Sequence, residues 1–373
     1  MHKIVISGGL GLLGQRIIRH IFSTGLHVRV LVVDTATPPV QGFDSAGSTA
    51  AGSGDRGGGD GDGGSKDEVL PGLSLKAEIV RGDLACPHVA AAIKSFASGG
   101  GCADSSATAA ATTTPSSLSL SSSLSVFHLA SVMSGQGEQD FDEALRVNID
   151  GTRSLLDTCR QVGGRPRFVF ASSIAAFGGG EEVMDGTKLL PQSTYGMTKA
   201  CAELLVNDCT RKGYVDGRIA RLPTVIVRPG PPNPAATGCF SSVPKAVLNG
   251  EHFVSPVSSD FLHPCISLSS AVQGLIRMHD ASEADMGTRD RAITLPAVSL
   301  TLRDLEKSAS RLARELGRSS GTVSYEPENA IEAVVKAMPS AVQVSNRATN
   351  LGLVEDAGAF EMVDEYVKSE WQR

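Results

Sequence analysis

The sequence of 373 residues lacks the features that would assign it to several specialised classes of protein. No apolar run approaches the ~20 residues that a membrane-spanning helix needs. No run of Lys and Arg forms the basic surface that binds nucleic acid or anionic lipid. The 34 Lys and Arg residues are outnumbered by 40 Asp and Glu residues, which gives a net charge of −6. We therefore expect neither a nucleic-acid partner nor a membrane partner.

The seven cysteines form no C-x-x-C pair and no His/Cys ligand spacing. An odd number of scattered thiols is typical of a reduced, intracellular protein, and it predicts neither a disulfide framework nor a metal site. The chain enters an apolar stretch at Ile4, so we expect no signal peptide. We expect a soluble, cytoplasmic protein, although an organelle address elsewhere in the chain stays open. Hydrophobic residues make up 41% of the sequence, which is enough for a sizeable core.

The N-terminal stretch, residues 3–14, carries the most informative local pattern. An apolar run at 4–6 predicts a buried parallel strand, and apolar residues at helical spacing follow it. Gly8, Gly11 and Gly14 separate the two elements. In a nucleotide-binding turn, such glycines make the sharp turn, let the backbone approach a pyrophosphate and let the helix pack close to the strand. The sequence therefore predicts a phosphate site at the helix start; a strand–turn–helix without a ligand is the plainer alternative.

The next predicted strand, 28–33, ends in Asp34, twenty residues after Gly14. A carboxylate at this place accepts hydrogen bonds from a ribose 2′-hydroxyl and repels a 2′-phosphate. No Arg or Lys immediately follows Asp34. These residues predict NAD, in preference to NADP, as the cofactor.

Two low-complexity tracts interrupt the chain at 35–67 and 97–123. They are rich in Gly, Ser, Ala and Thr, and cannot bury enough apolar area to offset the entropy of ordering. The remaining sequence, outside these two tracts, predicts an α/β fold: a Rossmann-type doubly wound parallel sheet with a smaller C-terminal α/β substrate lobe. We place an NAD-binding domain at 1–230, interrupted by the two tracts, and mainly the substrate-binding lobe at 231–373. The later strands are expected at 75–80, 126–130, 168–171, 218–222, 225–227, 292–295 and 322–325, and the later helices at 88–96, 140–162, 195–212, 301–316, 331–336 and 358–367.

Tyr195 and Lys199 lie four residues apart, which places them on one face of the predicted helix. A phenol with a pKa near ~10 is a poor base at neutral pH, but nearby positive charge favours the phenolate. Tyr195 can then accept the proton of a substrate alcohol while a hydride leaves the same carbon. Ser173, at the end of a predicted strand, can hold the substrate oxygen against Tyr195. The pattern alone is also found on solvated helix faces; its position after a nucleotide-binding N-terminus favours catalysis.

The chain resembles the extended short-chain dehydrogenase/reductases. The segments that carry the resemblance are the glycine loop, 81–84, 127–130, 172–178, the Tyr195-x-x-x-Lys199 pair and 221–225. Within that superfamily it most closely resembles the D-erythronate dehydrogenases, through 128–136, 148–153, 203–208 and 216–230. Phe177 stands where sugar-nucleotide epimerases usually carry Tyr, which counts mildly against epimerase activity.

The resemblance implies a role for each matching residue. It makes Ser173, Tyr195 and Lys199 the catalytic set. The residues implied to bind NAD are Gly8, Gly11, Gly14, Asp34, Asp83, Leu84, Ala130, Ser131, Tyr195 and Lys199. Relatives often pair helices as dimers, so a homodimer is expected on the same ground.

Candidate substrate residues are Ser134, Gln136, Ser173 and Arg228. Arg228 is the best cation for a substrate carboxylate, because a guanidinium binds a carboxylate bidentately; a surface salt bridge is the alternative. Loop polarity explains Ser134 and Gln136 nearly as well as substrate contact does. His263 and Lys245 are weaker candidate cations for the same carboxylate.

For two polar residues inside predicted elements we expect a structural role in preference to a catalytic one. His128 lies within a strand and is expected to be a packed core histidine. Asn148 is expected to bridge backbone groups, and support of a proton relay through water is the alternative.

The leading hypothesis is an NAD-dependent dehydrogenase that oxidises the C2 hydroxyl of a small sugar acid, D-erythronate by resemblance, to 2-dehydro-D-erythronate. An NDP-sugar epimerase or dehydratase with retained NAD is the second hypothesis, and a non-catalytic NAD-sensing protein is the third.

Overall fold

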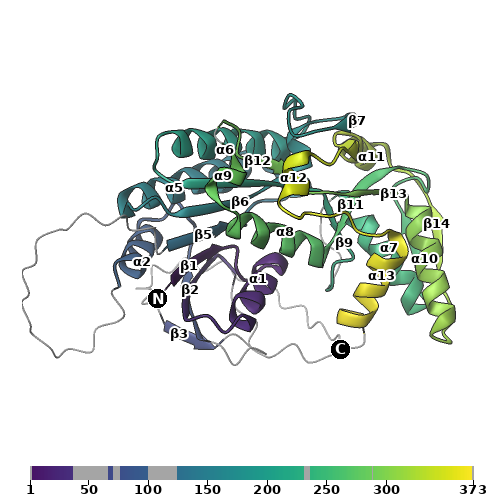
Figure 1. The fold of residues 1–373 in the computed structure, drawn as a ribbon. Helices are drawn as coiled ribbons and strands as arrows, with labels where there is room; N and C mark the ends of the chain where they lie inside the picture. Colours follow the sequence, from purple (N-terminus) through teal and green to yellow (C-terminus); the bar gives the residue numbers. More distant parts are fainter. Residues whose placement is uncertain are drawn as a thin grey trace, which may run out of the picture.

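The computed structural model describes residues 2–36, 66–69, 76–99, 124–230, 236–287 and 289–371. Its centre is an eight-stranded sheet in the order β12-β8-β6-β5-β1-β2-β4-β3 (Figure 1). All neighbouring strands are parallel except β3 and β4, at one edge. The strands are β1 (His2–Ser7), β2 (Val28–Asp34), β3 (Lys66–Val69), β4 (Lys76–Arg81), β5 (Leu124–His128), β6 (Arg167–Ser173), β8 (Asp216–Leu222) and β12 (Ala292–Thr294). The strand order reverses beside β1, where ligands bind in sheets of this kind.

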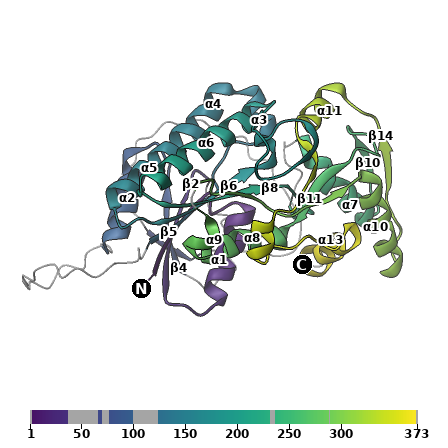
Figure 2. The same cartoon turned by 45° about the horizontal axis from the view of Figure 1, so that its top comes forward.

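Helices cover both faces of this sheet (Figures 1 and 2). Successive residues of a strand face opposite sides; Ile4 and Ile6 of β1 pack in one core cluster and Val5 in another. The first cluster is closed by α1 (Leu12–Ser23) and α8 (Leu268–Asp280), and the second by α2 (Pro87–Ser98), α5 (Gly151–Val162) and α6 (Thr194–Arg211). The fold is therefore a doubly wound α/β sheet, as the sequence predicts.

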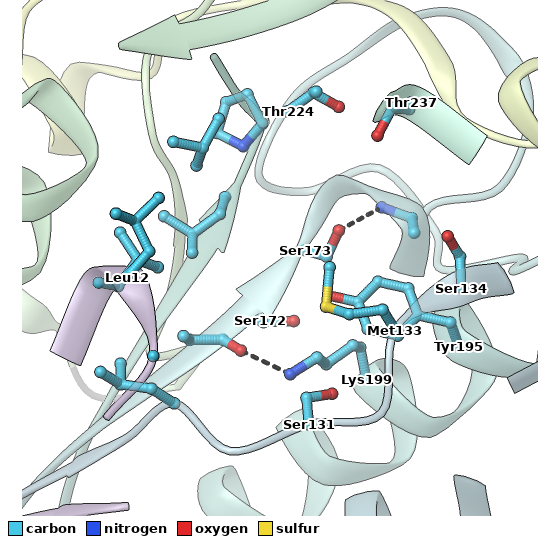
Figure 3. A pocket seen from close by; sticks show the side chains of 18 of the residues that line it. Leu12, Ser131, Met133, Ser134, Ser172, Ser173, Tyr195, Lys199, Thr224 and Thr237 are labelled. Atoms are coloured by element: carbon cyan, nitrogen blue, oxygen red, sulfur yellow. Dashed lines mark hydrogen bonds between the residues drawn. The ribbon is translucent and has the colours of Figure 1, made fainter. Parts of the chain in front are cut away.

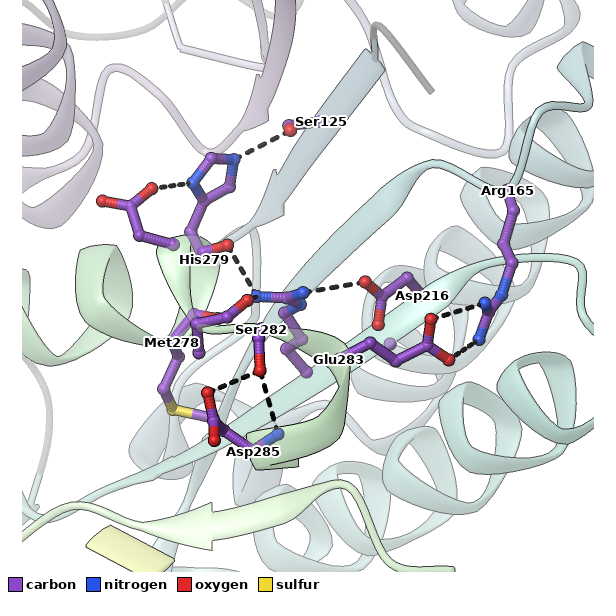
Figure 4. A network of polar contacts seen from close by, with 12 residues as sticks. Ser125, Arg165, Asp216, Met278, His279, Ser282, Glu283 and Asp285 are labelled. Carbon is purple, nitrogen blue, oxygen red and sulfur yellow. Dashed lines mark hydrogen bonds and ion pairs between the residues drawn. The ribbon is translucent and has the colours of Figure 1, made fainter. Parts of the chain in front are cut away.

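A buried arginine fixes α8 to the sheet. Arg218 of β8 is fully buried and donates to the carbonyls of Met278, His279 and Ala281 at 2.6, 2.6 and 2.7 Å. The guanidinium also pairs with Asp216 at 2.8 Å. Figure 4 shows Met278, His279 and Asp216 gathered at this joint. A cation at the C-terminus of a helix satisfies carbonyls that have no partner within the helix.

The remaining elements form a smaller C-terminal lobe around a third core cluster. Its three-stranded sheet, β13-β11-β9, contains β9 (Thr224–Ile226), β11 (His263–Ser267) and β13 (Val298–Leu300). The other strands form two two-stranded sheets. One pairs β10 (His252–Ser255) with β14 (Thr322–Tyr325), and the other pairs β15 (Pro339–Val342) with β7 (Gly180–Val183). The lobe's helices are α7 (Cys239–Asn249), α10 (Leu302–Glu315), α11 (Asn329–Lys336) and α13 (Ala359–Tyr366), with the π-helix η4 (Val367–Trp371). The short helices of the whole molecule are α3 (Ser134–Gln139), α4 (Phe141–Leu145), η1 (Arg146–Asp150), η2 (Ile174–Ala176), η3 (Ala236–Gly238), α9 (Glu283–Met286) and α12 (Asn346–Asn350).

The structure differs from the sequence predictions at several elements. The helix expected at 140–162 consists of α4, the π-helix η1 and α5. The helices α7 and α8 and several strands of three or four residues are additional. β3 begins within the last residues of the low-complexity tract predicted at 35–67. Most of that tract and most of the tract at 97–123 lie outside the described residues. The division at residue 230 stays a prediction, but after it β12 is a strand of the large sheet and α8 packs on one face of that sheet.

No helix in the described part of the chain combines the length and apolarity needed to cross a membrane.

Candidate active site

Two cavities meet at the carboxyl ends of the central strands. The first, of about 270 Å³, is lined by Ser173, Tyr195 and Lys199 among others (Figure 3). The second is lined by Asp34, Asp83 and other residues beyond β2 and β4. Both cavities are lined by Gly8, Gly11, Leu129 and Ser131. A pair of cavities joined over a glycine loop matches the two halves of a dinucleotide joined by its pyrophosphate.

The glycine loop is packed so closely that a side chain on Gly8 or Gly14 would meet neighbouring backbone. Gly8 has φ +71°, a backbone conformation that glycine adopts readily, and a Cβ there would lie 2.8 Å from the Ala130 nitrogen. A Cβ on Gly14 would lie 2.5 Å from the Cα of Gly9. Gly11 is the N-cap of α1 and offers no side-chain cap, so the helix start faces the cavity with free N–H groups. The loop therefore fits the phosphates of NAD.

The second cavity holds the acidic residues predicted to bind adenosine. The Asp34 carboxylate accepts hydrogen bonds from the backbone of Leu10 and Ala36, both at 3.0 Å, which fixes it at the loop. Asp83 accepts from the Ala85 nitrogen at 2.8 Å and forms an ion pair with Arg146. Leu84 and Ala130 line the same cavity. The residue that the sequence reasoning missed here is Arg146, whose partner Asp83 is 63 positions away in the chain.

Ser173, Tyr195 and Lys199 come together from β6 and α6 in the first cavity. Ser193 caps α6 by accepting from the Gly196 nitrogen at 3.1 Å, which sets where the helix begins. Lys199 donates to the Ala171 carbonyl at 2.8 Å, and its Nζ lies 5.5 Å from the centre of the Tyr195 ring. Ser173 accepts from the Ala175 nitrogen at 3.2 Å and also hydrogen bonds to Tyr195.

Burial controls the ionisation of this group. It raises the pKa of Tyr195 to about 12, against the opposing effects of the Ser173 hydrogen bond and the Arg228 charge. Burial lowers the pKa of Lys199 to about 7, and the charge of Glu203 opposes that shift. The Tyr195 phenol is therefore protonated at neutral pH unless further positive charge beside it lowers its pKa.

A buried ionic network supports the catalytic helix from behind. The Glu203 carboxylate on α6 accepts from Arg221 Nε and Nη2 at 2.8 to 3.1 Å and from the Ser172 hydroxyl. Arg221 also donates to the Asp185 carbonyl at 2.8 Å, and its guanidinium lies over the Phe177 ring. Glu203 and Arg221 belong to segments that carry the family resemblance, but their contact is not predictable from sequence because they lie on the separate elements α6 and β8.

Asn148 and His128 are held by the protein itself. The Asn148 amide accepts from the Val132 nitrogen at 2.8 Å and donates to Thr198 at 2.9 Å. His128 lies 2.6 Å from the Ser7 hydroxyl and 2.7 Å from that of Thr152, and burial lowers its pKa to about 3. These contacts agree with the structural interpretation of both residues.

The predicted substrate residues do not all share one cavity. Ser134, Ser173 and Arg228 line the first, whereas Gln136 lines the second, beside Glu143 and Arg146. That position separates Gln136 from the candidate substrate group. Its role as a substrate residue stays a prediction.

The two weaker candidate cations do not line the first cavity. His263 is fully buried and lies behind Thr224, with a pKa lowered by burial to about 3, so it carries no charge for a carboxylate at neutral pH. Lys245 donates to the carbonyls of Arg228 and Gly230 and supports that loop. The first cavity is also lined by residues that no sequence pattern indicates, among them Met133, Thr224, Thr237, Val334 and Met338. Met133 directly precedes α3, whereas Thr224, Thr237, Val334 and Met338 reach this cavity only through the folding of the C-terminal lobe.

No cluster of three or more His, Cys, Asp or Glu side chains that could hold a metal ion occurs among the described residues.

A sequence profile of the NAD dependent epimerase/dehydratase family matches residues 116–285. The chain belongs to this family, the extended short-chain dehydrogenase/reductases, and is an NAD-dependent oxidoreductase. D-erythronate dehydrogenase of Cupriavidus necator is 40% identical over 245 residues, which cover 65% of this chain and 74% of the relative. D-erythronate dehydrogenase of Haemophilus influenzae is 35% identical over 246 residues, or 65% and 76% of the two chains.

Solved structures share the whole fold. The nucleoside-diphosphate-sugar epimerase from Agrobacterium tumefaciens has a TM-score of 0.76 and 26% identity, covering 100% of this chain and 95% of its own. L-threonine 3-dehydrogenase from Trypanosoma brucei has a TM-score of 0.73 at 21% identity, covering 99% and 96%. These likenesses confirm the predicted fold class.

Proposed function

We propose that the protein oxidises the C2 hydroxyl of a small sugar acid, D-erythronate, to the 2-keto acid, with Tyr195 as the base. The observation that carries the proposal is the pairing of Tyr195 and Arg228 in one cavity. Arg228 lies close enough for its charge to lower the pKa of the Tyr195 phenol. In a 2-hydroxy acid the carboxylate is one carbon from the reacting alcohol, so a cation beside the base suits this substrate class. The D-erythronate dehydrogenase relatives support the specific acid.

Each group has a defined task in the proposed reaction. Ser173 hydrogen bonds the C2 oxygen and orients it toward Tyr195, which takes the hydroxyl proton. Arg228 holds the carboxylate and stabilises negative charge at the phenolate. Bound NAD would supply the acceptor for the hydride of C2, and the positive charge of its nicotinamide would lower the pKa of Tyr195. Lys199 would hold the ribose beside Tyr195 and add positive charge there.

Two features disfavour the alternative of a nucleotide-sugar epimerase. The cavity of about 270 Å³ carries Val334 and Met338 in its wall, apolar groups that offer no hydrogen bonds to a second nucleotide. Phe177 is buried and stacked under Arg221, so it does not replace the missing Tyr of the epimerases. The likeness to the Agrobacterium tumefaciens epimerase keeps this the second candidate.

The test is a screen of four-carbon to six-carbon aldonates with NAD and NADP, followed by absorbance of the reduced cofactor. The wild-type protein should reduce NAD with D-erythronate. Tyr195→Phe should lower kcat by a factor of ~10²–10⁴. Arg228→Met should raise KM by ~10–100-fold, because a hydrogen bond to a charged group contributes ~1.5–3 kcal/mol.

Arg153→Met is the matched control for Arg228→Met, because the Arg153 side chain is 73% exposed on α5. Undiminished activity of Tyr195→Phe would refute the catalytic role. Tightly retained NAD with turnover of a UDP-sugar would favour the epimerase, and cofactor binding without turnover of any acid would favour an NAD-sensing protein.

A further inference from the structure

Thr224 is a cavity residue with a defined hydrogen-bond partner on its far side. It begins β9 and lines the first cavity together with Arg228 and Ser173. Figure 3 shows Thr224 above the Ser173, Tyr195 and Lys199 group, on the side of Thr237. Its Oγ1 lies 2.6 Å from Nε2 of His263, at the start of the neighbouring strand β11. The hydroxyl therefore lies between a buried imidazole and the space proposed for the sugar acid.

The location of the His263 proton decides what Thr224 can offer the cavity. His263 has no exposed surface, and within the described residues its Nδ1 has no hydrogen-bond partner. A neutral imidazole carries a single N–H. If that N–H were on Nδ1, a buried donor would remain unsatisfied, at a cost of ~1–3 kcal/mol. If it is on Nε2, the unsatisfied atom is an acceptor, which native structures tolerate better.

On this assignment His263 Nε2–H donates to Thr224 Oγ1 across the 2.6 Å contact. The Thr224 hydroxyl cannot then donate back to that nitrogen, so its own hydrogen is left for another acceptor. No other side-chain hydrogen bond of Thr224 occurs among the described residues. The available direction is the cavity.

We propose that Thr224 positions the substrate by donating a hydrogen bond to an oxygen of the sugar acid beyond C2, and that His263 fixes the direction of this donor. The inference rests on the proposed function, which assigns the carboxylate to Arg228 and the C2 hydroxyl to Tyr195 and Ser173. The remaining acceptors of a small aldonate are the hydroxyl oxygens farther along its chain. Thr224 thus distinguishes a polyhydroxy acid from a 2-hydroxy acid with an alkyl chain, and His263 is a positioning residue.

The first experiment compares wild type with Thr224→Val, which removes the hydroxyl at nearly constant shape. With D-erythronate and saturating NAD, Thr224→Val should raise KM by ~3–10-fold, the equivalent of one neutral hydrogen bond, with kcat nearly unchanged. Thr349→Val, an exposed threonine in α12, should leave both constants unchanged. Circular dichroism and the melting temperature show whether each variant folds.

The second experiment changes the partner. His263→Phe removes the donor to Thr224 and should raise KM as Thr224→Val does, whereas His263→Gln retains an N–H and should restore part of the loss. The double variant Thr224→Val/His263→Phe should be no worse in KM than Thr224→Val alone, because His263 acts through Thr224.

The outcomes separate the two proposals. If wild type reduces no NAD with any aldonate, the proposed function fails. If wild type is active and Thr224→Val, correctly folded, keeps its KM for D-erythronate, the inference about Thr224 fails alone. A loss in kcat without a change in KM, or additive losses in the double variant, would also overturn it.

Discussion

Removal of the Glu203 carboxylate tests how strongly the buried network supports the active site. Glu203 and Arg221 have side chains only 2% and 4% exposed, and two guanidinium nitrogens donate to the carboxylate. Glu203→Gln keeps the size of the side chain and an oxygen for the Ser172 hydroxyl. It removes the charge and leaves a buried guanidinium without its counter-ion.

The expected loss of stability is large because the pair is buried. Removing one partner of a buried ion pair costs ~3–5 kcal/mol, since the other charge stays desolvated and uncompensated. An exposed pair contributes ~0–1 kcal/mol. The same helix offers such a pair in Asp208 and Arg211, which are 51% and 69% exposed. Asp208→Asn is therefore the matched control.

The assay is urea unfolding followed by circular dichroism for wild type, Glu203→Gln and Asp208→Asn. Glu203→Gln should lower the free energy of unfolding by ~3–5 kcal/mol and Asp208→Asn by ~1 kcal/mol or less. The double variant Glu203→Leu/Arg221→Met should be more stable than Glu203→Gln, because an apolar pair removes the orphaned charge. A second readout is activity, since loss of the Glu203 charge further lowers the pKa of Lys199.

Equal effects of Glu203→Gln and Asp208→Asn would refute this reasoning. So would a loss below ~1 kcal/mol for Glu203→Gln, because the network would then be energetically equivalent to a surface pair.

Three further predictions concern the cofactor site and one buried histidine. Gly14→Ala should abolish most NAD binding in a calorimetric titration, because its Cβ would meet the Gly9 backbone at 2.5 Å, whereas Gly186→Ala, with open space around its Cβ, should bind normally. Asp34→Ala should reduce the preference for NAD over NADP by ~10–100-fold in kcat/KM, the loss of a charged acceptor; unchanged discrimination would contradict the assignment. His128 has a folded pKa of about 3 and a reference value of 6.5, so the unfolded chain binds more protons between these values and stability falls as the pH drops below 6.5. At pH 5 the loss from His128 should reach about 2 kcal/mol, and His128→Gln should weaken the pH dependence of urea unfolding.

The regular elements of the nucleotide-binding half were predictable because their signals are local. β1, the glycine loop and α1 occupy adjacent residues, and the periodicity changes from strand to helix at Gly8. Some additional elements had weaker signals. α7 contains Pro244, which argues against a helix in sequence, and the strands β10, β13 and β15 have only three or four residues. Their pairing partners lie far away in the chain, so tertiary contacts decide them.

The helix predicted at 140–162 illustrates a finer limit. Its apolar spacing gave the helix but not the π-helical segment η1, which holds Asn148 against Val132 and Thr198. The same limit applies to Gln136. Its proximity to Ser134 in sequence suggested one shared site, but Ser134 lines the first cavity and Gln136 the second.

The sequence by itself determined the glycine loop, Asp34 and the spacing of Tyr195 and Lys199, because each depends on neighbours within one or two elements. Only the tertiary structure decided which side chains surround the proposed substrate. Thr224 and Arg228 come from one segment and Val334 from another far along the chain, and they meet in one cavity because the C-terminal lobe folds over the carboxyl ends of the strands. Local propensity does not predict these contacts, because the contacts depend on packing between segments that are far apart in the chain.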